Sequence, residues 1–154
     1  MHLARSLAAS AALAVVVAGP AVAGDNAATV QALYAAFGAG DVPAILAQLA
    51  PDVEWDYGYE GTSIPFFTPR HGTAEVALFF ESLAGLEFRK FEVLNMLEGG
   101  NQIAVLVDFD LVVRATGSAI VDQEMHLWTF GDDGKVARFR HFADTEEFAA
   151  AVAD

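Results

Sequence analysis

Cysteine is absent from the 154-residue sequence, which excludes disulfides, thiol catalysis and zinc–thiolate sites. Basic residues are scarce as well, because 8 Lys and Arg stand against 21 Asp and Glu, for a formal net charge of −13. Phosphate groups are bound by clusters of basic side chains, so nucleic acid is not an expected partner. The acidic balance also argues against binding to anionic membrane surfaces.

The sequence also lacks an apolar run of the ~20 residues that a membrane-spanning helix needs. The run at 7–18 is shorter, follows a weakly basic start, and precedes a Gly-Pro pair at 19–20 and Ala-Val-Ala at 21–23. This order is typical of a secretory signal peptide with its cleavage site. We therefore expect residues 1–23 to be removed on export to the periplasm or the medium, with no membrane association afterwards. An uncleaved membrane anchor is the alternative.

Apolar residues are plentiful in what remains. Hydrophobic residues make up 55% of the chain and 12 are Phe, so residues 24–154 can build the core of one domain. Three segments carry apolar residues at helical spacing: Val30, Leu33, Tyr34 and Phe37; Ile45, Leu46 and Leu49; and Val76, Phe79, Phe80 and Leu83. A short strand at 53–57 and a loop at 58–72 separate the second predicted helix from the third.

From residue 88 onward the apolar period changes to two. Four strands are predicted at 88–98, 102–115, 119–130 and 135–143, separated by glycine-containing turns. Asp144 opens a last helix, because Asp-Thr-Glu-Glu at 144–147 has the spacing of a capping box. The predicted fold class is α+β, with three N-terminal helices packed on an antiparallel sheet and a short C-terminal helix.

Symmetric turns between these strands predict which side chains share a face of the sheet, since side chains alternate with period two. They place Glu124 opposite both Phe109 and His141, and His126 opposite Phe139 and Val107. One face then holds Val107, Phe109, Leu111, Glu124, His126, Trp128, Phe139 and His141. The same arithmetic across the 99–100 turn places Lys90 and Glu92 on the inner face.

The order of elements resembles the NTF2-like superfamily, in particular its SnoaL-like and ketosteroid-isomerase-like branch. The segments that carry the resemblance are VQALYAAFGAGDVPAILAQLAPDVEWD, RHGTAEVALFFESL and HLWTFGDDGKVARFRHFADTEEF. The resemblance implies a cone-shaped fold, with a curved sheet wrapped around helices, a pocket between them, and a homodimer through the sheet. The superfamily includes isomerases, cyclases, dehydratases, epoxide hydrolases and non-catalytic binders, so the fold does not define the activity.

The resemblance also implies roles for single residues. His126 matches the position of the oxyanion-hole Asp of ketosteroid isomerases, and His141 matches an acid–base Asp of SnoaL-type cyclases. The isomerase tyrosine position holds Leu33, with Tyr34 next to it. The isomerase base position holds Tyr57, with Asp56 just before it. The steroid isomerase mechanism is therefore not inherited intact, and any chemistry would use the histidines.

The candidate catalytic residues are His126, His141, Glu124 and Asp56. Histidine titrates near pH ~6.5 and suits proton transfer, and Glu124 is placed to orient His141. Asp56 is the weaker candidate, because alternation after Trp55 turns it away from the pocket. Two alternatives remain: the histidines only hydrogen-bond inside a binding cavity, or both bind a metal together with Glu124. Because the superfamily is mostly metal-free, we expect no metal or cofactor.

The expected ligand is a small, apolar, oxygenated molecule. Its predicted contacts are Tyr34, Trp55, Tyr57, Phe109, Leu111, Trp128 and Phe139, and the aromatics of the 58–72 loop would form a lid or an apolar rim. Three hypotheses follow: a cofactor-free acid–base enzyme of isomerase, cyclase or lyase type, a non-catalytic small-ligand binder, or a dimeric interaction module that uses Met125 and Leu127 on the outer face.

Overall fold

The computed structural model describes residues 15–17 and 25–153. In chain order its elements are β1 (Val15–Val17), α1 (Asp25–Ala39), α2 (Val42–Leu46), β2 (Leu49–Trp55), the 3-10 turn η1 (Pro65–Phe67), β3 (Arg70–His71), α3 (Gly72–Ser82), η2 (Leu83–Gly85), β4 (Leu86–Gly99), β5 (Gln102–Val113), β6 (Ala119–Phe130), β7 (Val136–Phe142) and α4 (Thr145–Val152). The fold is α+β, but β2 and β3 lie between α2 and α3, so the helices do not all precede the strands.

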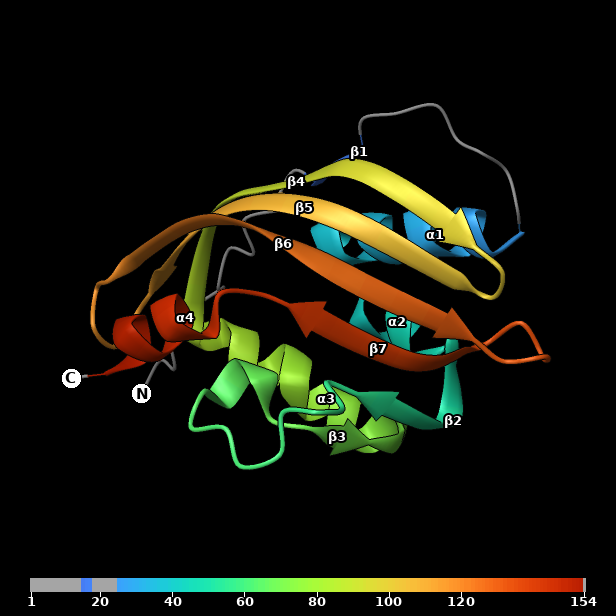
Figure 1. Ribbon diagram of the computed structural model, residues 1–154, viewed down its shortest axis with the longest axis horizontal. Coiled ribbons are helices and arrows are strands. Elements are labelled where there is room, and N and C mark those ends of the chain that lie inside the picture. Colours follow the sequence, from blue (N-terminus) through green and yellow to red (C-terminus); the bar gives the residue numbers. More distant parts are fainter. Residues whose placement is uncertain (1–14, 18–24, 154) are drawn as a thin grey trace, which may run out of the picture.

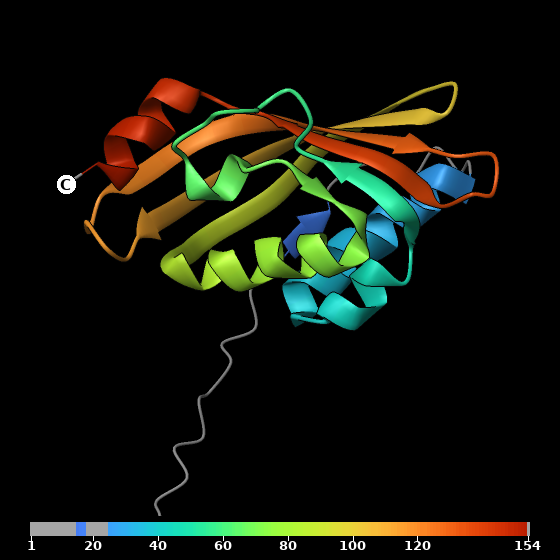
Figure 2. The ribbon, with the colours of Figure 1, turned by 90° about the horizontal axis from the view of Figure 1, so that it is seen from below.

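The strands form a single curved sheet in the order β1-β4-β5-β6-β7-β2-β3 (Figure 1). Strands β4 to β7 are an antiparallel meander, whereas β1 pairs with β4 and β2 with β7 in parallel. Helices α1, α2 and α3 lie against one side of the sheet and α4 lies at one end (Figure 2). The core therefore lies between the concave side of the sheet and the helices.

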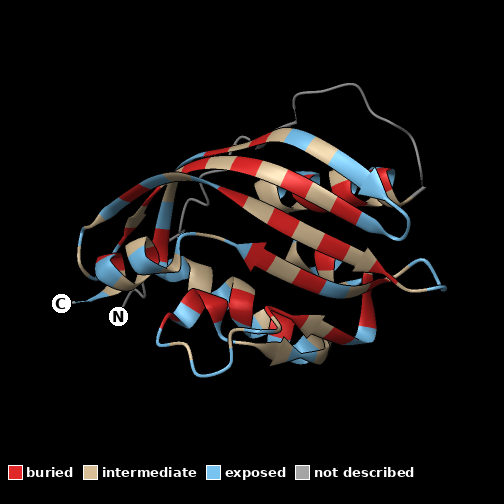
Figure 3. Ribbon diagram, in the orientation of Figure 1, coloured by how far each residue is buried: buried red, intermediate tan, exposed pale blue. Residues whose placement is uncertain are grey.

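Side-chain periodicity explains which faces are buried. In α1 the predicted stripe turns inward: Val30, Leu33 and Tyr34 are buried, and Phe37 packs against the core. Along β5, buried and half-exposed residues alternate almost without interruption (Figure 3). Asp41 caps α2 by accepting from the backbone N–H of Ala44, which is a common role of Asp at a helix N-terminus.

The inner face of β5, β6 and β7 carries all eight residues predicted for it, and each of them is buried. The register differs, however. Trp128 faces Phe139, because the pairing of β6 with β7 has a bulge next to Phe130. Val107 faces Glu124, because the turn after Val113 is longer than predicted. Both corrections amount to two residues, which preserves the face of every side chain. As a result His126 lies directly opposite His141.

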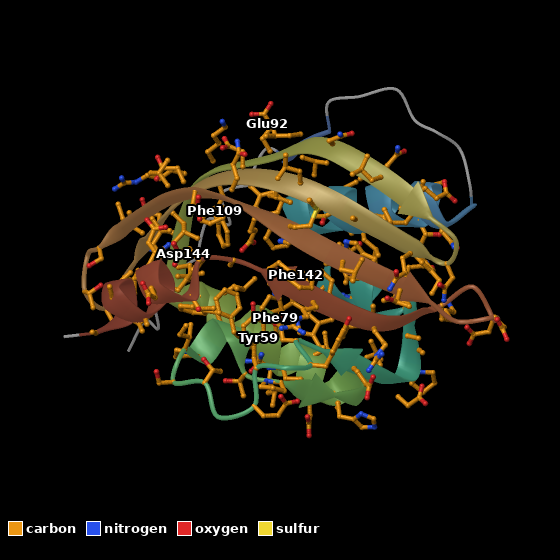
Figure 4. The ribbon with its side chains drawn as sticks, viewed as in Figure 1. Tyr59, Phe79, Glu92, Phe109, Phe142 and Asp144 are labelled. Atoms are coloured by element: carbon orange, nitrogen blue, oxygen red, sulfur yellow. The ribbon has the colours of Figure 1, made fainter. Side chains whose placement is uncertain are left out.

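The predicted inner face of β4 is wrong. Phe91 and Val93 are buried, whereas Lys90 is exposed and forms ion pairs with Glu92 and Asp108 on the outer face. Glu92 projects from the convex side of the sheet (Figure 4). The pairing of β4 with β5 is irregular after Phe88 and after Val93, and one extra residue in a strand reverses the face of every residue beyond it.

Asp144 accepts hydrogen bonds from the backbone N–H groups of Glu146 and Glu147 at the start of α4. It therefore serves as the predicted helix cap. The predicted signal peptide lies outside the described residues, apart from the three that form β1. Within the described residues no helix is long and apolar enough to cross a membrane.

Candidate active site

A cavity of about 80 Å³ lies between the concave face of the sheet and the helices. It is several times larger than the ~10–15 Å³ that one water molecule needs, and phenylalanine is the most frequent residue in its wall. Six of the seven residues predicted to contact a ligand line it: Tyr34, Trp55, Phe109, Leu111, Trp128 and Phe139. Glu124, His126 and His141 are the charged or titratable groups that join them in the wall.

Tyr57 is the exception among the predicted ligand contacts. Its ring lies beneath the guanidinium groups of Arg138, at 4.3 Å, and Arg140, at 5.5 Å. Arg138 and Arg140 alternate with the inward-facing Phe139, so this cluster belongs to the outer face of β7. Tyr57 therefore does not line the cavity.

Asp56 shows why the prediction at the end of β2 fails. It has a φ of 55°, a left-handed conformation that Asp tolerates better than most residues. Regular alternation stops there, and the Asp56 side chain turns inward and is fully buried. Asp56 therefore points into the core and not to the outer face that alternation predicts, although it does not itself line the cavity. No strand-based pattern reveals this conformation.

Asp56 holds His141. Its Oδ1 accepts from the His141 backbone N–H at 3.0 Å and lies 2.8 Å from Nδ1, while Oδ2 lies 3.1 Å from the same nitrogen. Burial disfavours the imidazolium, but the charge and hydrogen bond of Asp56, together with the charge of Glu124, outweigh burial and raise the pKa of His141. The Nδ1 proton is thereby directed at Asp56, which leaves Nε2 available to the cavity.

His126 belongs to a closed chain of hydrogen bonds. Trp128 Nε1 donates to the Tyr34 hydroxyl at 3.1 Å, and that hydroxyl lies 2.7 Å from His126 Nδ1. Because an indole only donates, the single Tyr34 proton is free to bond Nδ1. His126 then carries its proton on Nε2, which lies 2.7 Å from Glu124 Oε1.

The electrostatics of the His126–Glu124 pair differ from those of the His141–Asp56 pair. Burial lowers the pKa of His126 despite the opposing effect of Glu124, so the ring is kept neutral. Burial favours a raised pKa for Glu124, but the hydrogen bond from His126, with the charge of His141, lowers it. Burial also raises the pKa of Tyr34 well above its usual range. The chain thus ends in an ionised carboxylate.

These contacts revise two sequence-based expectations. Glu124 was expected to orient His141, but Asp56 holds that ring and Glu124 holds His126. His126 was expected to donate to a developing oxyanion, but Tyr34 and Glu124 occupy both of its nitrogens. A hydrogen-bond partner depends on side-chain direction and register, and neither follows from residue spacing.

Two polar atoms of residues in the cavity wall have no hydrogen-bond partner: Glu124 Oε2 and Trp55 Nε1. Glu124, His126 and His141 each offer one ligand atom within 4.8 Å of the others, which is a two-histidine, one-carboxylate set. A metal ion there would have to replace one of the two hydrogen bonds of the His126 ring, either with Tyr34 or with Glu124.

The loop between β2 and β3 covers part of the site. Phe66 and Phe67 line the cavity, and Phe67 contacts the rings of Tyr59 and His141 at 5.3 and 5.4 Å. The Tyr59 hydroxyl donates to the His141 backbone carbonyl at 2.9 Å, and Tyr59 and Phe79 both lie beneath β7 (Figure 4). Phe91 also lines the cavity and was missed, because the predicted register placed its neighbours inward.

A match to the SnoaL-like domain family covers residues 30–139. The chain therefore belongs to this family, within the NTF2-like superfamily. No curated protein matches it significantly.

Solved structures agree on the fold. An NTF2-like protein of unknown function from Burkholderia pseudomallei is 26% identical over 86% of this chain and 100% of its own, with a TM-score of 0.72. A protein from Xanthomonas campestris described as a polyketide cyclase is 21% identical over 83% of this chain and 96% of its own, with a TM-score of 0.65. One from Rhodopseudomonas palustris described as an isomerase is 18% identical over 85% and 97%, with a TM-score of 0.64.

Proposed function

We propose that this protein is a cofactor-free acid–base enzyme, of isomerase or cyclase type, for a small, mostly apolar, oxygenated molecule. Two structures of the same fold are described as a polyketide cyclase and an isomerase, which supports the reaction type. The observation that carries the proposal is the pairing of His141, whose Nδ1 is held by Asp56, with the ionised Glu124 in one aromatic cavity. An acid and a base are thus available to the same bound substrate.

The two groups divide the work by their protonation states. The raised pKa of His141 keeps its imidazolium populated to higher pH than in free histidine, so His141 supplies a proton. The lowered pKa of Glu124 keeps it ionised, so Glu124 accepts one. On an enol, Glu124 takes the O–H proton and His141 returns a proton to carbon, so that C=C–O–H becomes H–C–C=O without gain or loss of atoms. Such positioned groups contribute roughly 10²- to 10⁴-fold each.

The test is the ketonisation of benzoylacetone, an aromatic 1,3-diketone that contains both an enol hydroxyl and a carbonyl. Enol-rich stock is diluted into buffer, and the loss of enol absorbance is followed with and without protein. We expect acceleration by the wild type and a loss of roughly 10²- to 10⁴-fold in His141→Gln. His71→Gln is the matched control, because His71 is exposed at the start of α3 and should behave as wild type. Normal turnover by His141→Gln would refute the assignment.

A non-catalytic binding protein is the second candidate. Its support is the closed chain from Trp128 to Glu124, which commits one of the two histidines to holding the cavity wall. This candidate predicts saturable binding of benzoylacetone with no acceleration of ketonisation. Binding titrations run beside the kinetic assay separate the two candidates.

We also propose that the protein is exported and forms a homodimer. Export is supported by the signal-like order of residues 1–23. A dimer is supported by exposed apolar side chains at Val121 and Phe142, which are 68% and 45% exposed. N-terminal sequencing of the mature protein tests the first proposal, and light scattering during size-exclusion chromatography tests the second.

A further inference from the structure

Three polar groups of the cavity wall are left with bonding capacity. Glu124 Oε2 is an ionised acceptor and Trp55 Nε1 is a donor, and neither has a partner although their residues are only 8% and 2% exposed. His141 Nε2 is the third, since Asp56 takes the proton on Nδ1. Buried polar atoms are nearly always satisfied in folded proteins, so each exception needs an explanation. A bound ligand would supply the missing partners.

The Glu124 and His141 side chains are spaced so that one atom can bridge them. One carboxylate oxygen of Glu124 and one ring nitrogen of His141 lie within 4.8 Å of each other, yet no hydrogen bond joins these two described residues. Two hydrogen bonds of ~2.7 Å that meet at a tetrahedral oxygen span about 4.4 Å. In the imidazolium form of His141, which Asp56 favours, that oxygen must donate to the Glu124 carboxylate and accept from the His141 ring. A hydroxyl does both, whereas a carbonyl or an ether oxygen only accepts.

We infer that the ligand of this protein is an uncharged phenol or enol whose hydroxyl oxygen bridges Glu124 and His141, and whose carbonyl oxygen accepts from Trp55 Nε1. Phe139 and Phe79 each contact both Trp55 and His141. The two polar subsites therefore lie on one aromatic wall, against which a flat hydroxy-ketone can pack. The inference rests on the proposed function, because it names the substrate class of the same site. It describes the bound enol before proton transfer, when His141 contacts the oxygen that lies two bonds from the carbon it then protonates.

The charges of the site exclude an anionic head group at the bridging position. Asp56 and Glu124 are both buried carboxyl groups, and His141, whose positively charged form Asp56 favours, lies near both. A carboxylate or phosphate placed there would meet two negative groups in a medium that screens charge poorly. The ligand therefore reaches the site with its hydroxyl protonated, and Glu124 accepts the hydrogen bond.

Matched pairs of aromatic ketones test the hydroxyl. The probes are the three hydroxyacetophenone isomers and the three methoxyacetophenones, which differ only by an O-methyl group. Both tryptophans of the chain line the cavity, so quenching of their fluorescence reports binding directly. For at least one isomer we expect the hydroxyl compound to bind roughly ten- to a hundredfold more tightly than its ether, as befits a charge-assisted hydrogen bond.

Glu124→Gln links that preference to the bridging site. We expect the ratio of hydroxyl to ether affinity to fall towards one, while the ethers bind as they do to the wild type. Glu98→Gln, at an exposed position of β4, is the matched control and should keep the ratio. Retained ether binding in Glu124→Gln also shows that this variant is folded.

Three results would overturn the inference: no binding of any probe at millimolar concentration, equal affinities within every pair, or a preference that survives in Glu124→Gln. Equal affinities would mean that a water molecule fills the bridging position. The outcome is independent of turnover. A hydroxyl preference without ketonisation would refute the enzyme and keep this inference, whereas ketonisation that depends on His141 without a hydroxyl preference would do the reverse.

Discussion

The two histidines face each other across neighbouring strands, yet their surroundings give them opposite properties. Their rings lie 4.7 Å apart and nearly perpendicular, and each contacts a buried carboxyl group. His126 has partners on both nitrogens, whereas His141 has a partner on one. The pKa of His126 is lowered and that of His141 is raised.

The number of hydrogen-bond partners, more than burial, distinguishes a histidine that only supports the cavity wall from one that can react. Both rings are almost completely buried, and burial alone would keep both neutral. Asp56 reverses this for His141, because it supplies a full charge in bidentate contact with one nitrogen. A residue with one nitrogen held and the other free matches the needs of general acid catalysis.

Asp56→Asn is expected to have the largest effect on the difference between the two histidines. The amide can adopt the same left-handed conformation and can still accept from the His141 backbone N–H, but it removes the charge. We expect the pKa of His141 to fall and benzoylacetone ketonisation at neutral pH to slow by roughly 10²- to 10⁴-fold. Titration of the histidine signals by NMR measures the first effect, and the enol absorbance measures the second.

Asp52→Asn is the matched control for this variant, since Asp52 is exposed on the same strand. It should leave both the titration and the rate unchanged. If Asp56→Asn kept the wild-type pKa of His141, the carboxylate would not be the group that charges the ring.

Tyr34→Phe removes the hydroxyl that joins His126 to Trp128. Removing the hydroxyl leaves His126 Nδ1 and Trp128 Nε1 without their partner, and each unsatisfied buried group costs roughly 1–3 kcal/mol. We expect the free energy of unfolding to fall by about 2–4 kcal/mol, measured by urea denaturation. Tyr57→Phe is the control, because the Tyr57 ring lies on the outer face against Arg138, and it should change stability by less than about 0.5 kcal/mol. Similar losses in the two variants would contradict the assignment.

Residue spacing predicted the fold and the composition of the cavity wall because both depend on periodicity. The stripe on α1 and the inner face of β5 to β7 follow from periods of 3.6 and two. The predicted inner face of β5 to β7 is correct despite register errors of two residues. The predicted inner face of β4 is wrong, because its bulges change the face of Phe91 and Val93. A bulge has no reliable signature in residue type at this position.

The hydrogen-bond partners within the site could not be predicted in the same way. Asp56 reaches His141 only because its backbone leaves the strand conformation, which depends on the whole loop that follows. The observed partner of Glu124 differs from the predicted one, because His141 lies directly opposite His126 and not opposite Glu124. Residue types thus identified the acid–base groups, but tertiary geometry assigned their pairs.

The smallest expected effect is the pH dependence of stability, where the two histidines act with opposite signs. The raised pKa of His141 means that its contribution to stability is complete below pH 6.5 and is lost as pH rises through the folded-state pKa. The lowered pKa of His126 means that stability falls as pH drops below 6.5, where the unfolded chain takes up a proton. Asp56 and Glu124 favour the charged form of His141, and Arg70 opposes it.

His141→Gln isolates the first contribution. Above pH 6.5 the unfolding free energy of the wild type should decline relative to that of His141→Gln, with a slope of at most about 1.4 kcal/mol per pH unit for one proton. Urea denaturation of both proteins from pH 6 to pH 9 measures it, and His71→Gln should follow the wild type throughout. Parallel curves for wild type and His141→Gln would mean that folding leaves the pKa of His141 unchanged. His141 would then lack the positive charge that distinguishes it from the neutral His126.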